Sequence, residues 1–123
     1  MVKTRLYYCC DIHASNVCFK KILNVAKLDV YKANVIIVGG DLTGKRIVPI
    51  VRQTNGEYTA EFLENTHIMK NDSELAEMQK LVGNSGFYPY IASPEETQAL
   101  RKDRAKFDSL ITQLILERMK QWM

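Results

Sequence analysis

Two short apolar runs and one amphipathic segment make up most of the first 45 residues. Residues 5–10 and 35–38 are apolar runs of strand length, and the apolar positions of 17–31 recur at roughly helical spacing. Ser15 or Asn16 is a suitable capping residue for that helix. A strand, a helix and a second strand in this order predict a right-handed βαβ unit with parallel strands. The predicted fold class is therefore α/β.

The middle of the chain predicts a β-hairpin. Two β-rich runs, 47–53 and 57–63, flank Thr54-Asn55-Gly56. Asn-Gly between such runs is a strong hairpin signal, because both residues tolerate positive φ. Pro49 lies inside the first run and cannot donate a ladder hydrogen bond, which favours an edge position for that strand.

Residues 72–92 predict a short helix followed by a loop. Asn71 or Asp72 can begin the helix, and Gly83-Asn84 is typical of a helix end. The aromatic residues at 87–90 are expected to form a loop that packs against the domain.

The C-terminal segment has a clear helix start and a long apolar face. Ser93-Pro94-Glu95-Glu96 is a capping box with proline at the first helical position, and the helical segment that follows is expected to break near Asp103. The later apolar positions fall on one face at spacings of three and four residues. They are Phe107, Leu110, Ile111, Leu114, Ile115, Met119 and Trp122.

Composition places the chain among ordinary globular proteins. Of its 123 residues, 46% are hydrophobic and 25% charged, and the net charge of +3 is spread along the sequence. The sequence has no clustered basic stripe, so it does not indicate a nucleic-acid-binding surface. No N-terminal stretch has the n-region and h-region of a signal peptide, and no run approaches the ~20 apolar residues that a membrane span requires, so neither secretion nor membrane insertion is expected. Three cysteines, two of them adjacent, do not indicate a disulfide framework, so a cytoplasmic location is expected.

Polar residues with metal-binding chemistry follow both apolar runs of the βαβ unit. Asp11-Ile12-His13 follows the first run, and Gly40-Asp41 follows the second. The carboxyl ends of parallel strands meet at one sheet edge, where α/β proteins bind their ligands. Two carboxylates and one imidazole suit a divalent metal cation. Asp11, His13 and Asp41 are therefore the candidate metal ligands.

The pattern D-x-H, followed one βαβ unit later by G-D, resembles the opening of the calcineurin-like metallophosphoesterases. The resemblance implies that Asp11 and His13 bind one metal ion and that Asp41 links it to a second. It further implies Mn, Zn or Fe as the cofactor, a phosphate mono- or diester as the substrate, and a metallophosphoesterase-type sandwich of which this chain is the N-terminal part. In those terms residues 1–123 are a single partial domain, with a metal-binding βαβ unit at 1–45, a hairpin insertion at 46–66 and C-terminal helices within 72–123.

Several ligands of the complete family centre do not occur in this chain. The family signature continues with G-N-H-[DE], a lone histidine and G-H-x-H, whereas this sequence has two histidines in total. The second, His67, has no motif around it and is expected to be a surface or packing residue. Ala14 also replaces the glycine that usually follows the family's histidine. No complete catalytic set is therefore present, and the alternative function is a non-catalytic, truncated metal-binding or assembly module.

Two other motifs overlap the metal-binding pattern. Cys10-x-x-His13-x4-Cys18 has thiolate and imidazole ligands that suit structural zinc. Gly39-x4-Gly44-Lys45 matches most of a phosphate-binding P-loop, but Arg46 replaces the Ser or Thr that binds magnesium. A P-loop must also open a helix, and residues 47–51 are β-like.

The expected partners follow from the family resemblance and from the apolar pattern. A phosphate-ester substrate is expected, and a membrane is not. Nucleic acid is possible, because the family includes nucleases, but is not favoured. The strands of the βαβ unit and the apolar face of 107–122 would lack partners in this chain alone. We therefore expect either a homo-oligomer, with the terminal helix at its contact, or a missing C-terminal half of the domain.

Overall fold

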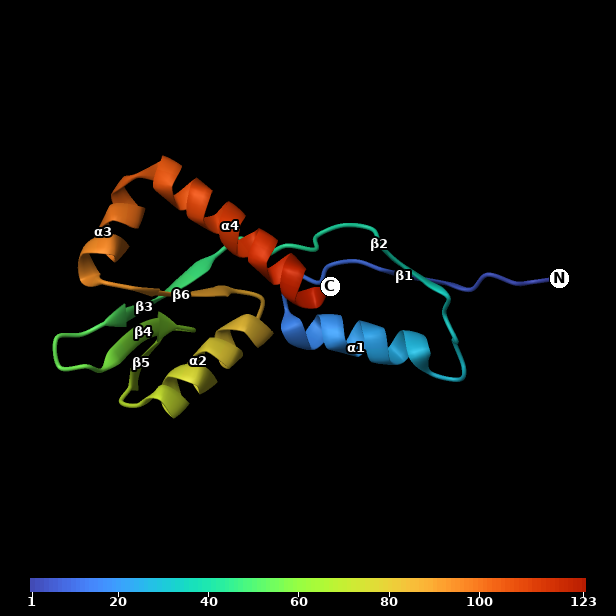
Figure 1. The fold of residues 1–123 in the computed structure, drawn as a ribbon, viewed down its shortest axis with the longest axis horizontal. Helices are drawn as coiled ribbons and strands as arrows, with labels where there is room; N and C mark the ends of the chain where they lie inside the picture. Colours follow the sequence, from blue (N-terminus) through green and yellow to red (C-terminus); the bar gives the residue numbers. More distant parts are fainter.

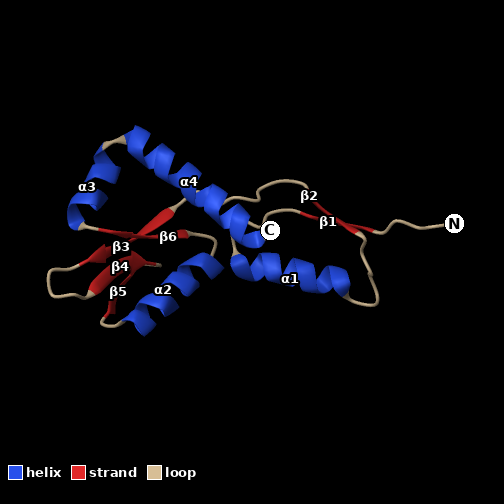
Figure 2. Ribbon diagram, viewed as in Figure 1, coloured by secondary structure: helices blue, strands red, loops and turns tan.

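Two separate β-sheets and four helices form a mixed α/β structure in the computed structural model, which describes residues 1–123 (Figures 1 and 2). Strands β1 and β2 form a small sheet that lies with helix α1 at one end of the molecule. Four further strands and helix α2 form the other end. Helix α4 extends from that end to the start of α1.

The predicted βαβ unit is present at the N-terminus. It consists of β1 (Leu6–Cys9), α1 (Asn16–Lys27) and β2 (Val35–Val38), and the two strands pair in parallel from Leu6↔Val35 to Cys9↔Val38. Ser15 caps α1, because its side chain accepts a hydrogen bond from the Cys18 amide at 3.2 Å. The helix is shorter than predicted, since Leu28 already leaves the helical conformation with a ψ of 146°.

A four-stranded sheet and α2 enclose the hydrophobic core. The strand order is β5-β4-β3-β6, in which β3 (Ile47–Arg52) and β6 (Tyr88–Ala92) are parallel and the other pairs antiparallel. The remaining elements are β4 (Tyr58–Phe62), β5 (Asn65–Met69) and α2 (Asp72–Asn84). Eight buried residues form the core: Val48, Ile50, Ala60, Phe62, Met69, Leu75, Met78 and Val82.

The predicted hairpin is present, but its first strand is not at an edge. Strand β3 lies between β4 and β6, so the edge position expected from Pro49 is wrong. The reason lies in the short pairing of β3 with β4, which involves only Val51 and Arg52 of β3. At Pro49 the side of β3 that faces β4 therefore carries no ladder pairing, and the missing N–H of proline is tolerated there.

Strand β6 occupies the segment for which an aromatic loop was predicted, so residues 72–123 are not helical throughout. All five of its residues pair with β3, from Ile47↔Tyr88 to Val51↔Ala92. This partner is about forty residues away in the sequence, and such a tertiary pairing overrides the local signal of Pro89. A second hairpin, between β4 and β5, was also not predicted. Its turn residues, Leu63 and Glu64, have φ values of 52° and 63° without the glycine or asparagine usual there.

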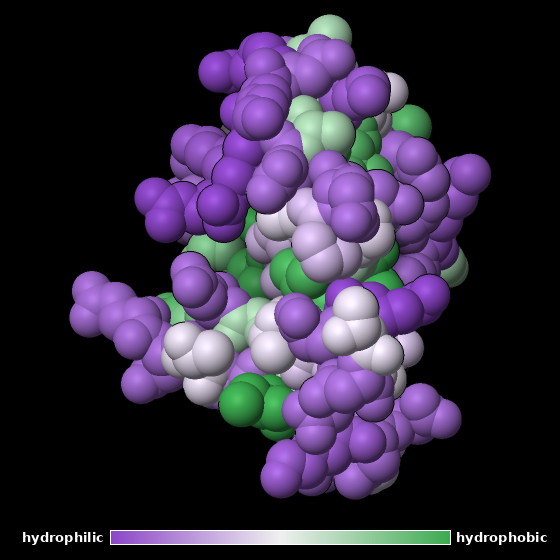
Figure 3. Space-filling model, turned by 90° about the vertical axis from the view of Figure 1, so that its left-hand side faces the viewer, coloured by the Kyte–Doolittle hydropathy of each residue, from purple (hydrophilic) through white to green (hydrophobic).

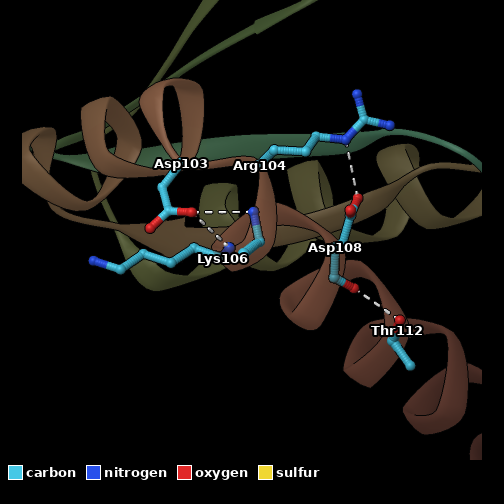
Figure 4. A network of polar contacts seen from close by, with 6 residues as sticks. Asp103, Arg104, Lys106, Asp108 and Thr112 are labelled. Atoms are coloured by element: carbon cyan, nitrogen blue, oxygen red, sulfur yellow. Dashed lines mark hydrogen bonds and ion pairs between the residues drawn. The ribbon is translucent and has the colours of Figure 1, made fainter.

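The two C-terminal helices begin and end as the sequence predicts. The capping box at Ser93 starts α3 (Pro94–Lys102), and Asp103 separates it from α4 (Arg104–Trp122). The Asp103 carboxylate accepts hydrogen bonds from the amides of Ala105 at 3.0 Å and Lys106 at 3.3 Å (Figure 4). The predicted apolar residues of α4 are half-buried, and the residue of this helix that is fully buried is Arg118.

Apolar surface is distributed unevenly over the molecule. The end of the molecule seen in Figure 3 is largely hydrophilic, with small separate apolar patches. One face of the β1–β2 sheet, in contrast, exposes two adjacent apolar pairs. They are Leu6 with Val35 and Tyr8 with Ile37. None of the four helices has the length and hydrophobicity needed to cross a bilayer.

Candidate metal centre

The loops that follow β1 and β2 bring the three candidate ligands together. Potential ligand atoms of Asp11, His13 and Asp41 all lie within 4.8 Å of one another. Backbone hydrogen bonds hold the two loops side by side beyond the strands: the His13 amide donates to the Asp41 carbonyl at 2.8 Å and the Ala14 amide to the Leu42 carbonyl at 2.8 Å. The parallel pairing of the strands is thus continued into the loops, and this cluster could hold a metal ion.

All three candidate ligands have an unusual backbone conformation. The φ angles are 59° for Asp11, 48° for His13 and 48° for Asp41, all in the left-handed region that non-glycine residues rarely adopt. Ala14 has a φ of 58°, so the position at which the family usually has glycine does require a left-handed backbone here. Such conformations cost free energy and concentrate at functional sites. The surrounding hydrogen bonds hold the two loops in a conformation that isolated peptides would avoid.

Hydrogen bonds around Asp11 lower the pKa of its carboxyl group. The Cys10 thiol donates to Oδ2 of Asp11 at 2.9 Å, and Nε2 of His13 lies 3.5 Å from Oδ1. The pKa of Asp11 is lowered mainly by the Cys10 hydrogen bond, with smaller contributions from Asp41 and His13. The same hydrogen bond and the charge of Asp11 raise the pKa of the Cys10 thiol. In the absence of a cation, both shifts favour an ionised Asp11 and a protonated Cys10.

The ligand set is exposed on the surface while its scaffold is buried. Asp11, His13 and Asp41 are exposed, whereas Ile12 and Ala14, which alternate with the first two, are buried. Carboxylate oxygens and one imidazole suit Mn²⁺, Fe²⁺ or Zn²⁺. Three protein ligands also leave coordination positions open for water or a substrate, as in catalytic metal sites.

The buried side of the two loops packs against the junction of α2 and β6. The Ser15 hydroxyl donates to the carbonyl of Asn84 at 2.6 Å, and the Gly44 amide donates to the Tyr88 hydroxyl at 2.9 Å. Gly86 lies against the carbonyl of His13 so closely that a Cβ atom at this position would overlap it. The sheet containing the core thus supports both ligand loops through one short segment.

The other candidate residues do not assemble into sites. Cys10 contacts Asp11, but Cys18 is exposed on α1, and neither cysteine belongs to the cluster of potential ligands. Gly44-Lys45 leads into strand β3 and not into a helix, as the β-like residues 47–51 predicted, so this motif does not form a P-loop. His67 lies half-buried on β5, with Nε2 3.4 Å from the Phe62 carbonyl, and is not part of the cluster.

Comparison with protein-family models, curated proteins and solved structures finds no match to this chain.

One residue that contacts the ligand loops was missed by the sequence interpretation. Arg118, near the C-terminal end of α4, is 6% exposed and donates to the carbonyl of Ala14. A signal was present, because position 118 is four residues after Leu114 and three after Ile115. It therefore falls on the apolar face of the helix, where an arginine requires buried hydrogen-bond acceptors.

Proposed function

We propose that this chain binds a divalent metal cation through Asp11, His13 and Asp41 and forms the first-metal half of a metallophosphoesterase-type centre. In its complete form such a centre would hydrolyse a phosphate mono- or diester. The fold would be the N-terminal part of the corresponding α/β sandwich. Mn, Zn and Fe are the cations proposed, in a binuclear arrangement once the second set of ligands is present.

The observation that supports this proposal best is the convergence of the three ligands. Asp11 and His13 come from one loop and Asp41 from the next, yet their ligand atoms lie within 4.8 Å of one another. All three have a left-handed backbone, a conformation that costs free energy and is concentrated at functional sites. The sequence motif and the local geometry support the same three residues independently.

The residues of this chain have separable roles in the proposed site. The carboxylates of Asp11 and Asp41 supply negative charge, and His13 supplies a nitrogen ligand. A divalent cation held there would polarise a phosphoryl oxygen and lower the pKa of a bound water molecule. The Cys10 thiol donates a hydrogen bond to Asp11 and lowers its pKa further, which favours the deprotonated form that binds a cation.

The chain does not contain the remaining residues of a two-metal hydrolase. It has one histidine besides His13, and that residue, His67, is outside the cluster. We therefore predict little or no hydrolysis of a chromogenic aryl phosphate ester, because the second metal's imidazoles and the leaving-group acid are missing. Robust turnover that His13→Ala abolishes in the purified chain would contradict this. The alternative function, a non-catalytic metal-binding or assembly module, shares the cation site and also predicts no turnover by this chain.

Calorimetric titration with Mn²⁺ tests the proposed cation site. We expect weak binding by the wild type, a large loss in Asp41→Asn and a smaller loss in Asp11→Asn, because Asp41 is the carboxylate proposed to be shared. Asp29→Asn is the matched control, since its carboxylate is almost fully exposed and outside the cluster. Equal affinity in the wild type and Asp41→Asn would refute the proposed site.

A further inference from the structure

A buried arginine links the C-terminal helix to the candidate metal centre. The Arg118 guanidinium donates to three backbone carbonyls: that of Ala14, that of Phe87 at 3.3 Å and, more weakly, that of Gly83 at 3.5 Å. No carboxylate pairs with it, and its charge is compensated by these oxygens and by the Tyr88 ring, whose centroid is 5.1 Å away. An arginine retains its charge when buried and can donate in several directions at once.

These contacts reach both ligand loops. Ala14 follows His13 directly, and its amide donates to Leu42, which follows Asp41. Tyr88, beneath the guanidinium, accepts a hydrogen bond from the Gly44 amide at 2.9 Å. Arg118 is therefore bonded directly to the first loop and is connected through Tyr88 to the second.

The end of α4 is itself fixed against the start of α1. The Trp122 indole donates to the Asn16 side chain at 2.7 Å and stacks on Phe19, with ring centroids 4.3 Å apart and planes 5° from parallel. These contacts lie one helical turn from Arg118. They hold in place the part of α4 that carries the guanidinium. Its reach toward the Ala14 carbonyl follows from the placement of the helix and does not depend on a flexible surface side chain.

We infer that Arg118 is a positioning residue, which sets the separation of the Asp11–His13 loop and the Asp41 loop and thereby the affinity of the site for a divalent cation. This inference rests on the proposed function, but the contacts that carry it are present without any cation. Replacing Arg118 would leave the buried Ala14 carbonyl with one partner fewer, and the first loop could then move relative to the second. Partners outside the ligand set typically change metal affinity by about 10- to 100-fold.

The test compares Arg118→Met and Arg118→Lys with the wild type. Methionine keeps an apolar stem without donors, and lysine keeps the charge without the planar arrangement of donors. Arg104→Met is the matched control, because Arg104 lies on the same helix, is largely exposed and pairs only with Asp108 (Figure 4). Each variant is titrated with Mn²⁺, and its Co²⁺ absorption spectrum is recorded at a temperature at which circular dichroism shows it to be folded.

We expect Arg118→Met to lose at least about tenfold in Mn²⁺ affinity and to change the Co²⁺ spectrum, with partial recovery in Arg118→Lys and no change in Arg104→Met. Tyr88→Phe serves as a milder variant if Arg118→Met does not fold. It keeps the ring beneath the guanidinium and removes the acceptor of the Gly44 amide, so a weaker loss of affinity is expected. Unchanged affinity and spectrum in the folded variants would overturn the inference.

A measurement without metal separates this inference from the proposed function. In the metal-free chain, nitrogen-15 correlation spectra should show the amide signals of both Ala14 and Gly44 shifted by Arg118→Met and unmoved by Arg104→Met. If the wild type binds no cation, the proposed function fails, yet shifts at both amides would still support Arg118 as the residue that positions the loops. If the Gly44 signal does not move, the link to the second loop is refuted, whatever the cation affinity.

Discussion

Gly86 offers a sharp test of how the core supports the ligand loops, through the substitution Gly86→Ala. Its φ is 88°, and an added Cβ atom would overlap the carbonyl oxygen of His13. Gly56 provides the matched control, because its φ is 84° but an added Cβ atom would meet nothing within 4 Å. The two alanine variants therefore share the backbone strain and differ in the steric overlap.

The expected magnitudes follow from these two contributions. A left-handed alanine costs about 1–2 kcal/mol, and the reduced freedom of the unfolded chain offsets about 0.4–1 kcal/mol of this. Gly56→Ala should thus lower the free energy of unfolding by about 1 kcal/mol. Overpacking adds typically 1–3 kcal/mol, so Gly86→Ala should lower it by about 2–4 kcal/mol. Because the overlap is with His13, Mn²⁺ affinity should also fall in Gly86→Ala alone.

Urea unfolding followed by circular dichroism measures both free energies, and calorimetry measures the affinity. The comparison requires similar m-values in the three proteins, so that a shifted midpoint reports stability. Equal destabilisation by the two substitutions would show that the His13 loop adjusts freely. The inference that the α2–β6 junction supports the site would then be wrong.

Two further predictions concern the acidity of Asp11 and self-association. Cys10→Ala should raise the pKa of Asp11 toward its ordinary value, since the thiol hydrogen bond is the main cause of the lowered pKa. In the wild type this interaction stabilises the fold above the ordinary aspartate pKa of about 4, and the contribution is lost as the pH falls through the lowered value. Carbon-detected NMR titration of the Asp11 carboxyl measures this pKa, with Cys18→Ala as the control. An Asp11 pKa that is the same in the wild type and in Cys10→Ala would refute the thiol hydrogen bond as the cause. Sedimentation should show a dimer or larger assembly. Tyr8→Glu should weaken this assembly, because Tyr8 lies on the exposed apolar face of the small sheet. A monomer that neither Tyr8→Glu nor Leu114→Glu changes would contradict the predicted self-association.

The N-terminal unit and its candidate ligands could be predicted because their signals are local. Two apolar runs separated by one helix give parallel strands, and residues directly after parallel strands lie at one edge. Asp11, His13 and Asp41 could therefore be grouped without knowledge of any distant contact. The left-handed backbone of Ala14, with a φ of 58°, was not predicted, because the sequence showed only that alanine replaces the family's glycine.

The rest of the fold depended on contacts that are distant in the sequence. Strand β6 forms because β3 offers a parallel partner, and nothing local to Tyr88-Pro89-Tyr90 shows this. The central position of β3 likewise depends on where its pairing with β4 stops. Arg118 donates a hydrogen bond to a loop residue 104 positions earlier, and the helical pattern shows that it faces inward without showing what it contacts.

The buried residues are distributed unequally between the two ends of the molecule. All eight core residues belong to β3, β4, β5 and α2, whereas the buried residues of 1–45 are Ile12, Ala14, Ser15, Ala26 and Gly44. Four of these five lie in or beside the ligand loops, so the N-terminal βαβ unit contacts the remainder through the buried side of these loops and through the packing of Trp122 on the start of α1. All three candidate ligands belong to this unit, so local opening of the unit itself would disperse them, and a cation that binds only the folded unit opposes that opening. At a concentration one hundred times the dissociation constant, the cation would add about 2.7 kcal/mol to the cost of opening. The ion would thus stabilise the end of the molecule that has the fewer buried residues, in addition to any chemistry that it performs.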